Sequence, residues 1–428
     1  METWSLAVVA AALLVYAGVS RRLERSVVSS AMLFLTVGLL TGAKVLGWFD
    51  LKVNSGSVRA LAEVTLTLVL FADASRIDLR ALRKELSLPA RLLGIGLPLT
   101  IVAGTLAAWL VFGQLIWAEA LVLAIVLAPT DAALGQAVVT DPRLPSRVRQ
   151  GLNVESGLND GICVPLLFIA VALAEADSDA ISVQHAVTLV VEEIGYGIVG
   201  GVIAGVAGAL VLRVAERRGL VADDWRQVIP VAAAALSYGI AVPLGGSGFI
   251  AAFVGGLFFG VLVPRRESSV TYLVEVGGQT LSGVTFLVIG AVALGTALGD
   301  LDWEIAVYAV LSLTVVRMVP VALGLLGSRA RRPTVLYTGW FGPRGLASIV
   351  FAIIVLEGSS LAHVDLLVTT AVITVALSVF AHGLTAVPLT NAYARWYEAH
   401  TEKPPMEAAP VREQRWRRPV PAPSLEMK

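Results

Sequence analysis

Cysteine and histidine are nearly absent from this chain. The single cysteine, Cys163, lies inside an apolar stretch, so the sequence holds neither a disulfide framework nor a site built from several thiolates. Four histidines, His185, His363, His382 and His400, show no metal-ligand spacing and are expected in loops or at helix ends. No glycine-rich loop carries a phosphate-binding lysine, which argues against transport driven by ATP. We therefore expect no cofactor and no nucleotide.

Charge is also scarce. Charged residues make up 15% of the chain and sum to a net charge of zero, so no nucleic-acid partner is indicated. Hydrophobic residues make up 57%, whereas soluble domains have about 45–50% hydrophobic and about 25% charged residues. This apolar surface exceeds what one globular core needs, and it predicts an integral membrane protein.

Thirteen apolar stretches, each near the ~20 residues that cross a bilayer as a helix, are separated by charged or turn-rich segments. We predict an all-α polytopic membrane protein with one transmembrane helix for each stretch. The first stretch lacks a basic leading region and a small-residue cleavage site, so we expect a span rather than a signal peptide. The stretches are residues 4–20, 27–41, 58–74, 88–112, 117–139, 152–174, 183–212, 227–242, 246–263, 277–298, 303–326, 335–356 and 363–389.

The loops between the stretches differ in charge. Those after odd-numbered stretches are rich in arginine, whereas those after even-numbered stretches carry only Lys44, Lys52 and Arg59. The positive-inside rule places the amino terminus outside the cell membrane and the carboxyl terminus in the cytoplasm. One missed or invented span would reverse the alternation downstream, so the pattern supports the count of thirteen.

The last part of the chain differs in composition. Residues 394–428 hold six prolines among charged residues and cannot bury a core. We expect a transmembrane domain over residues 1–393, followed by a disordered cytoplasmic tail over residues 394–428.

Two carboxylates lie at the middle of consecutive stretches. Asp131 follows Thr130 in the fifth stretch, and Asp160 follows Asn159 in the sixth. An ionised carboxylate at the bilayer midplane costs at least ~2.5 kcal/mol, so packing alone does not explain either residue. They indicate a path or a binding site for cations. Other acidic residues, Asp73, Glu63, Glu119 and Glu357, lie near the ends of stretches, where Asp73 and Glu63 are expected to reach the interface.

The chain also shows a repeat with two interruptions. If the long seventh stretch is a connector, six spans precede it and six follow in the opposite topology. The fifth members of the two halves carry helix breakers mid-span, Pro129 in one and the run Gly342-Pro343-Arg344-Gly345 in the other. Such paired interruptions favour broken helices that face a midplane ion site, over the alternative of ordinary proline kinks.

Helical spacing groups the polar residues of the sixth stretch. Ser156 and Asp160 are four residues apart and share one face, so both could address one cation, while Glu155 lies on the neighbouring face and needs its own partner. Thr130 and Asp131 supply further oxygen ligands. Because burial disfavours a carboxylate's charged form, Asp160 holds either a proton or a cation near neutral pH. Competition for one site is the minimal mechanism of exchange.

Two arginines fall at the same depth as these carboxylates. Arg317 and Arg344 lie, like Asp131 and Asp160, within about one turn of the middle of their stretches. Because guanidinium groups stay protonated, both are interpreted as structural counter-charges rather than proton carriers.

These residues resemble a known family, the monovalent cation:proton antiporter-1 family of the NhaP type, which includes the sodium/proton exchangers. The resemblance rests on three segments and covers residues 1 to about 390. The segments are Ala128-Pro129-Thr130-Asp131, Asn153-Val154-Glu155-Ser156-Gly157-Leu158-Asn159-Asp160-Gly161 and Phe341-Gly342-Pro343-Arg344-Gly345.

The resemblance implies a homodimer in which each protomer has a dimerisation domain and a core domain that moves as an elevator, with crossed, broken fifth and twelfth helices. Asp160 resembles the essential ion- and proton-binding carboxylate, with Asp131, Thr130 and Ser156 as further members of the ion site. Asn159 resembles the asparagine of the branch that exchanges one cation per proton.

The resemblance also implies roles for the charged residues near the site. Glu155 is similar to a buried family glutamate whose arginine partner is placed at Arg317, and Arg344 matches the arginine of the twelfth-helix break. Many members read Thr-Asp-Pro at the fifth break, whereas in this chain Ala132 follows and the proline is Pro129, so the break is expected to shift by a residue or two.

The function predicted from the sequence is exchange of Na+, or of Li+ or K+, for H+ across the cell membrane, with competition at Asp160. Alternatives are a cation channel, whose charged ring is usually repeated by oligomeric symmetry, and a K+/H+ exchanger with a role in pH homeostasis. An anion carrier is disfavoured by the acidic midplane, and an enzyme by the lack of a nucleophile, base and metal constellation.

Overall fold

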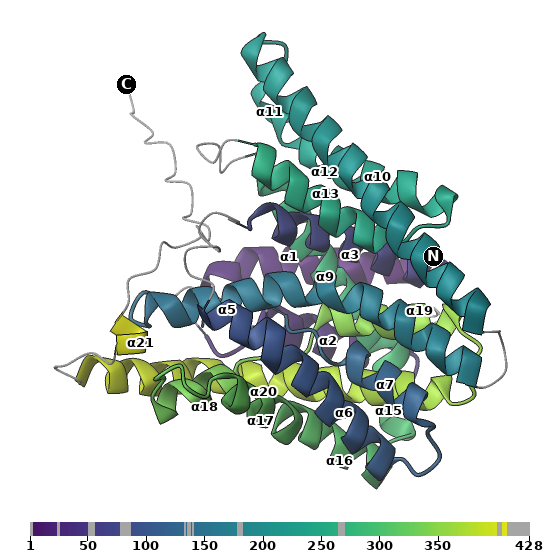
Figure 1. The fold of residues 1–428 in the computed structure, drawn as a ribbon, viewed down its shortest axis with the longest axis vertical. Coiled ribbons are helices and arrows are strands. Elements are labelled where there is room, and N and C mark those ends of the chain that lie inside the picture. Colours follow the sequence, from purple (N-terminus) through teal and green to yellow (C-terminus); the bar gives the residue numbers. More distant parts are fainter. Residues whose placement is uncertain are drawn as a thin grey trace.

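The computed structural model describes residues 3–23, 26–49, 56–77, 87–131, 134, 138, 141–177, 183–263, 270–399 and 405–408. Every regular element within these ranges is helical (Figure 1). The all-α architecture expected from the composition is therefore confirmed.

The first half of the chain forms helices of very different lengths. They are α1 (Thr3–Leu23), α2 (Ser30–Thr41), α3 (Gly56–Ser75), α5 (Ser87–Arg91), the π-turn η1 (Leu92–Gly96), α6 (Leu97–Val111), α7 (Trp117–Val126), α9 (Ser146–Asp177) and α10 (Val183–Arg217).

The second half continues in the same way. It comprises α11 (Asp223–Arg226), α12 (Val228–Ala241), the 3-10 turn η2 (Val242–Leu244), α13 (Gly248–Leu262), α14 (Tyr272–Ile289), the π-turn η3 (Gly290–Leu294), α15 (Gly295–Gly299), α16 (Trp303–Leu313), α17 (Val315–Gly324), α18 (Arg332–Trp340), α19 (Leu346–Gly358), α20 (Val364–Ala399) and α21 (Pro405–Ala408).

Eight helical stretches within the described ranges are long and apolar enough to cross a membrane, and the shorter apolar helices α2, α7, α13 and α19 accompany them. Side chains such as Leu14 on α1 and Leu110 on α6 are more than two-thirds exposed, as expected of lipid-facing residues. The total of thirteen crossings and the inverted repeat stay predictions.

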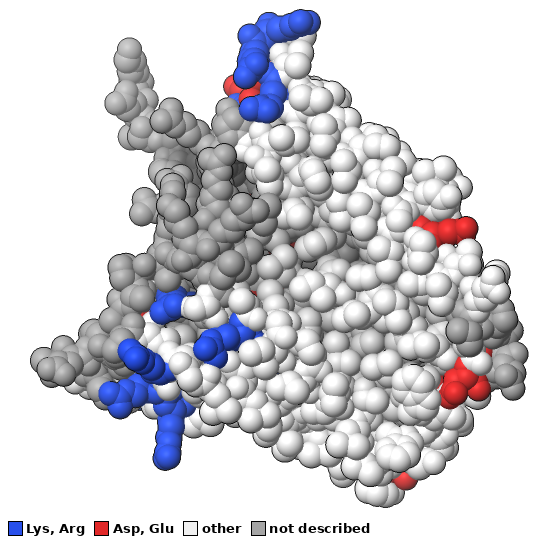
Figure 2. Space-filling view, in the orientation of Figure 1, with Lys and Arg blue, Asp and Glu red and all other residues white. Residues whose placement is uncertain are grey.

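Charged side chains are confined to the margins of the surface shown in Figure 2. Basic residues gather along the left and upper edges, acidic residues lie along the right, and the broad area between them carries almost no charge. An uncharged belt between two charged rims is the pattern of a membrane-spanning surface.

The helices pack in two groups. The α3–α13 group consists of α2, α3, α10, α12, α13 and α14, and the α9–α20 group consists of α5, α6, α7, α9 and α16 to α20. In Figure 1 the helices α10, α12 and α13 lie at the top, α16, α17, α18 and α20 at the bottom, and α9 between them. The groups meet where α3, α10 and α13 contact α9, where α3 and α14 contact α19, and where α2 contacts α20.

Small residues bring the helices of the α3–α13 group into backbone contact. A Cβ atom on Gly205 of α10 would overlap the backbone of Gly255 on α13, and one on Gly256 of α13 would overlap the backbone of Phe71 on α3. Close approach of this kind strengthens the van der Waals packing that helps helices associate where lipid removes the hydrophobic drive between them.

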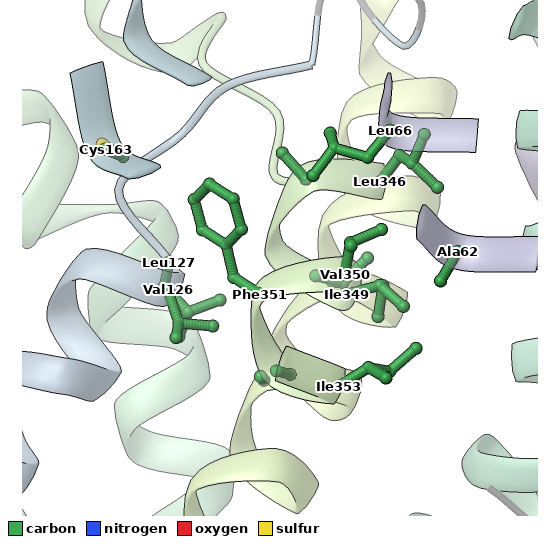
Figure 3. Packing of buried hydrophobic residues seen from close by; sticks show 14 of the residues in the cluster. Ala62, Leu66, Val126, Leu127, Cys163, Leu346, Ile349, Val350, Phe351 and Ile353 are labelled. Atoms are coloured by element: carbon green, nitrogen blue, oxygen red, sulfur yellow. The ribbon is translucent and has the colours of Figure 1, made fainter. Parts of the chain in front are cut away.

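Helix α19 is buried on nearly all sides and joins the two groups. Figure 3 shows the Phe351 ring extending from α19 toward the side of α9 that carries Cys163, with Val126 at the end of α7 beside it, while Leu346 faces Leu66 of α3. A helix that is apolar all round needs such a position. Its first residues, which form the site described below, are thereby fixed from both groups.

Two expectations about single regions need correction. His382 lies in the middle of α20 and is 1% exposed, not at a helix end, because its ring nitrogens bond to Ser378 and to the Trp340 carbonyl. Helix α20 runs to Ala399, beyond the boundary expected at residue 394. Tyr393 stabilises this extension by stacking on the ring of Tyr337 with centroids 4.4 Å apart.

A short piece of the expected tail is also ordered. In α21, the Glu407 carboxylate is 2% exposed and accepts hydrogen bonds from the Arg331 amide at 3.1 Å and the Thr334 hydroxyl at 2.6 Å. These groups lie at the start of α18, where a negative charge complements the helix dipole. Residues 409–428 lie outside the described ranges, so disorder there stays a prediction.

Candidate functional site

Two interruptions in the helices face each other at the centre of the molecule. Helix α7 ends at Val126, and Pro129 cannot supply an amide to continue it, whereas the twelfth predicted span is split by the non-helical residues 341–345. The Asp131 amide donates to the Pro343 carbonyl at 2.8 Å, and the Leu346 amide donates to Asp131 Oδ2 at 3.1 Å. The Asp131 carboxylate thus lies at the N-terminus of α19, where the helix dipole stabilises a negative charge.

Arg344 lies in the second break, residues 341–345, and its side chain binds the backbone of the first break, which follows α7. Its side chain is fully buried, and Nη1 donates to the carbonyls of Ala128 and Pro129, the latter at 3.3 Å. These carbonyls follow the C-terminus of α7, the negative end of that helix, so a cation is favoured there. Arg344 therefore serves as a fixed counter-charge that ties the two breaks together.

Helix α9 adds a row of polar side chains against the first break. The hydroxyls of Thr130 and Ser156 are 3.0 Å apart, and Asn159 Nδ2 donates to Thr130 Oγ1 at 2.7 Å. Asn159 Oδ1 and Asp160 Oδ1 are buried and have no hydrogen-bond partner within the described part of the chain. Two buried oxygens without a donor, one of them on a carboxylate, are suited to a proton, a water molecule or a cation.

A cavity with about 60 Å³ of free space opens beside these residues. Asp131 and Asp160 line it from the α9–α20 group, and Asp73, Glu275 and Arg76 line it from α3 and α14. Space of this size holds several water molecules. The cavity therefore lies between the two helix groups and is bordered by carboxylates from both.

Asp73, expected near the end of its span at the membrane interface, lies two residues before the end of α3 and faces the cavity. Its carboxylate lines the cavity and lies 3.4 Å from Arg76, which also pairs with Glu275 at 2.7 Å. The signal available in the sequence was an acidic residue three positions before a basic one at the end of an apolar stretch. Which neighbouring helix it faces could not be read from that spacing.

Glu155 and Arg317 form a separate ion pair away from the cavity. Arg317 donates from both terminal nitrogens to the two Glu155 oxygens, with Nη2 to Oε2 at 2.9 Å, and both side chains are 2% exposed. A Cβ atom at Gly342 would overlap the Arg317 guanidinium. The pair therefore packs directly against the second break and supports it from α9 and α17.

The donor set defines what the site can bind. No three His, Cys, Asp or Glu side chains among the described residues converge closely enough to hold a metal ion tightly. The oxygens present are those of carboxylates, hydroxyls and an amide, which suit a hard monovalent cation that keeps part of its water. Thr130 and Ser156 are not among the described residues that line the cavity, and their hydroxyls bond to each other.

Comparison with known proteins gives one family. The model of the sodium/hydrogen exchanger transmembrane family matches residues 9–392. A solved structure of the sodium proton antiporter MjNhaP1 from Methanocaldococcus jannaschii at pH 8 superposes with a TM-score of 0.72, covering 92% of this chain and all of that one at 19% identity. This likeness shows that the two chains share a fold.

Two related sequences are named as cation/proton antiporters, and this chain matches only part of the length of each. A K(+)/H(+) antiporter NhaP of Alkalimonas amylolytica is 27% identical over 75% of this chain and 55% of its own length. A Na(+)/H(+) antiporter of Saccharomyces cerevisiae is 24% identical over 74% of this chain and 34% of its own length. The chain thus spans about half, or less, of the length of these relatives.

Proposed function

The chain belongs to the sodium/hydrogen exchanger family of transmembrane proteins, and we propose that it exchanges a monovalent cation, Na+ or K+ or Li+, for H+ across the cell membrane. The observation that carries the proposal is Asp160 in the cavity, with a buried Oδ1 that no described donor satisfies. The names of the relatives include both K+ and Na+ exchange, so the cation is left to the experiment.

The chemistry of the exchange rests on competition at Asp160. A carboxylate oxygen without a donor is stabilised either by a bound proton or by a cation, and a second positive charge at the same oxygen is disfavoured. The Asp131 carboxylate, which accepts the Leu346 amide at the start of α19, attracts the cation, while the Thr130 and Ser156 hydroxyls supply neutral oxygens. Cation binding therefore releases the proton, and protonation releases the cation.

Asn159 sets the proposed stoichiometry. Its amide donates to Thr130 and adds no charge beside Asp160. One titrating carboxylate then couples one cation to one proton, which makes the cycle electroneutral. Asn159→Asp would add a second acidic group and should make exchange depend on the membrane potential.

The two helix groups supply a route for alternating access. Asp131 and Asp160 lie in the α9–α20 group, whereas Asp73 and Glu275 face them from the α3–α13 group. We propose that the α9–α20 group is the core domain and slides against the other, the dimerisation domain of a homodimer, carrying the cation as an elevator. The basic left rim in Figure 2 is the cytoplasmic side, with the amino terminus outside and the carboxyl terminus inside.

The test uses proteoliposomes with an imposed pH gradient and a pH-sensitive dye. Addition of Na+, K+ or Li+ should collapse the gradient for at least one cation, and Asp160→Asn should abolish the response. Asp300→Asn is the matched control, because Asp300 is exposed between α15 and α16. A gradient unaffected by all three cations would refute antiport, and a cation current without proton movement would establish a channel instead.

A further inference from the structure

A chain of buried hydrogen bonds connects α20 to the second helix break. The Arg344 amide donates to Ser378 Oγ at 2.6 Å, Ser378 Oγ lies 3.1 Å from His382 Nδ1, and His382 Nε2 lies 2.9 Å from the Trp340 carbonyl. Ser378, His382 and Arg344 are each at most 1% exposed. This series of hydrogen bonds therefore begins at the Arg344 amide, within the break, and ends at the Trp340 carbonyl, just before the break.

One order of donors and acceptors satisfies both nitrogens of a neutral imidazole through this series of hydrogen bonds, although His382 Nδ1 lies 3.0 Å from the Ser378 carbonyl as well as 3.1 Å from the Ser378 hydroxyl. A carbonyl can only accept, so His382 Nε2 carries the proton and donates to Trp340. Nδ1 then accepts from the Ser378 hydroxyl, which in turn accepts from the Arg344 amide. The ring is also held by stacking on the Trp340 indole, with centroids 4.9 Å apart. Every member thus has a fixed orientation.

The position of the break determines the position of Asp131. The Pro343 carbonyl accepts the Asp131 amide, and the Leu346 amide donates to the Asp131 carboxylate. These two groups flank Arg344, whose amide is the one that Ser378 fixes. A shift of the break along α20 would therefore move the Asp131 carboxylate within the cavity that it shares with Asp160.

We propose that His382 and Ser378 are positioning residues, which set the register of residues 341–345 against Asp131 and thereby the affinity of the site for its cation. This inference rests on the proposed cation/proton exchange. Neither residue lines the cavity among its described residues, so they act through the backbone of the break and not by contact with the ion.

Loss of the His382 side chain should change the position of the break at residues 341–345 more than it changes the stability of the protein. The Trp340 carbonyl also accepts the Gly342 amide at 2.8 Å, so a variant lacking the imidazole leaves no bare buried carbonyl. His382→Leu is therefore expected to fold. His382→Gln keeps one amide donor and one acceptor on a side chain of similar reach, and it is the conservative variant for rescue.

The experiment measures the half-saturating cation concentration and the maximal rate of exchange in proteoliposomes. His382→Leu and Ser378→Ala should raise the half-saturating concentration about tenfold, the equivalent of one ordinary hydrogen bond, with maximal rates within about twofold of the wild type. His382→Gln and Ser378→Thr should return it to within about twofold of the wild type.

Thr385→Val is the matched control on the same helix. Thr385 accepts the Trp340 indole N–H at 3.0 Å but has no part in the chain to Arg344, so its half-saturating concentration should be that of the wild type. An equal shift in this control would overturn the inference, as would an unchanged affinity in His382→Leu or a loss confined to the maximal rate. If His382→Leu does not fold, Ser378→Ala decides the question. Absence of exchange in the wild type would instead refute the proposed function.

Discussion

Arg317→Met is expected to destabilise the protein by about 3–5 kcal/mol, because it leaves the Glu155 carboxylate buried without its partner. Both side chains are 2% exposed and share two parallel hydrogen bonds, so water cannot replace the lost guanidinium. Arg317→Lys should recover only part of the loss, since an ammonium group cannot reproduce the planar two-point contact.

The double variant Glu155→Leu/Arg317→Met separates the value of the pair from the cost of leaving one charge alone. Replacing both members of a buried pair by apolar residues is often neutral, or stabilising by about 1–4 kcal/mol, so the double variant should be more stable than either single one. Equilibrium unfolding in mixed detergent micelles gives the free energies. The more exposed pair of Arg59 with Glu63, one turn apart on α3, is the control, and its removal should change stability by less than about 1 kcal/mol.

Single losses that simply add in the double variant, within about 0.5 kcal/mol, would refute the coupling of the two charges. They would mean that the two charges are solvated independently in the folded protein. The packing of Gly342 against the Arg317 guanidinium would then no longer be explained by the ion pair.

Contacts elsewhere in the molecule lead to three more expected outcomes. Gly345→Ala should abolish exchange without loss of protein, because a Cβ atom there would overlap the Asp131 carboxylate, and transport per amount of protein measures this. Glu407→Ala should lower stability by about 1–3 kcal/mol and speed proteolysis of the tail, because it removes the acceptor of two hydrogen bonds at the start of α18. Partial burial disfavours the charged form of Asp141, but the hydrogen bonds from Arg143 outweigh this effect and lower the pKa of Asp141 below its ordinary 3.8. The pair of Asp141 with Arg143 therefore stabilises the folded protein at pH values above 3.8. Asp141→Asn should therefore lower the melting temperature near neutral pH, and the difference from the wild type should vanish as the pH falls through the lowered pKa of Asp141.

The first two of these predictions each have a matched control. Gly358→Ala at the end of α19 adds a methyl group to open space and should leave exchange unchanged. Glu398→Gln changes an exposed glutamate at the end of α20 and should not affect proteolysis of the tail. Exchange that survives in Gly345→Ala, a tail unaffected by Glu407→Ala, or a defect in Asp141→Asn that persists at low pH would each contradict the corresponding contact.

Much of the candidate site follows from local rules that the sequence carries. Pro129 and Pro343 lack the amide that a helix needs, so the interruption of both spans could be predicted without a fold. The spacing of Ser156 and Asp160 along one helix placed them on one face. The partnership of Glu155 with Arg317 was implied by the family resemblance, and both members are present as a buried pair.

Other features lay beyond such rules. Asp73 and His382 were interpreted from their positions along their own segments, as an interfacial acid and a helix-end histidine. In the structure Asp73 lines the cavity and His382 is buried against the break. Glu407 was assigned to a disordered tail by composition, yet it binds the start of α18. For His382 and Glu407 the partner lies on another helix far away in the chain, and Asp73 shares its cavity with residues of distant helices.

Composition, and neighbours within one or two turns, were enough to predict a helical membrane protein, the places where its helices break and the carboxylates that stand in apolar spans. Three-dimensional packing was needed to show which break faces which, that Arg344 binds the carbonyls after α7, and that carboxylates from two helix groups border one cavity. Those contacts depend on how closely helices approach, and that is fixed by small residues such as Gly205 and Gly256 meeting distant backbones.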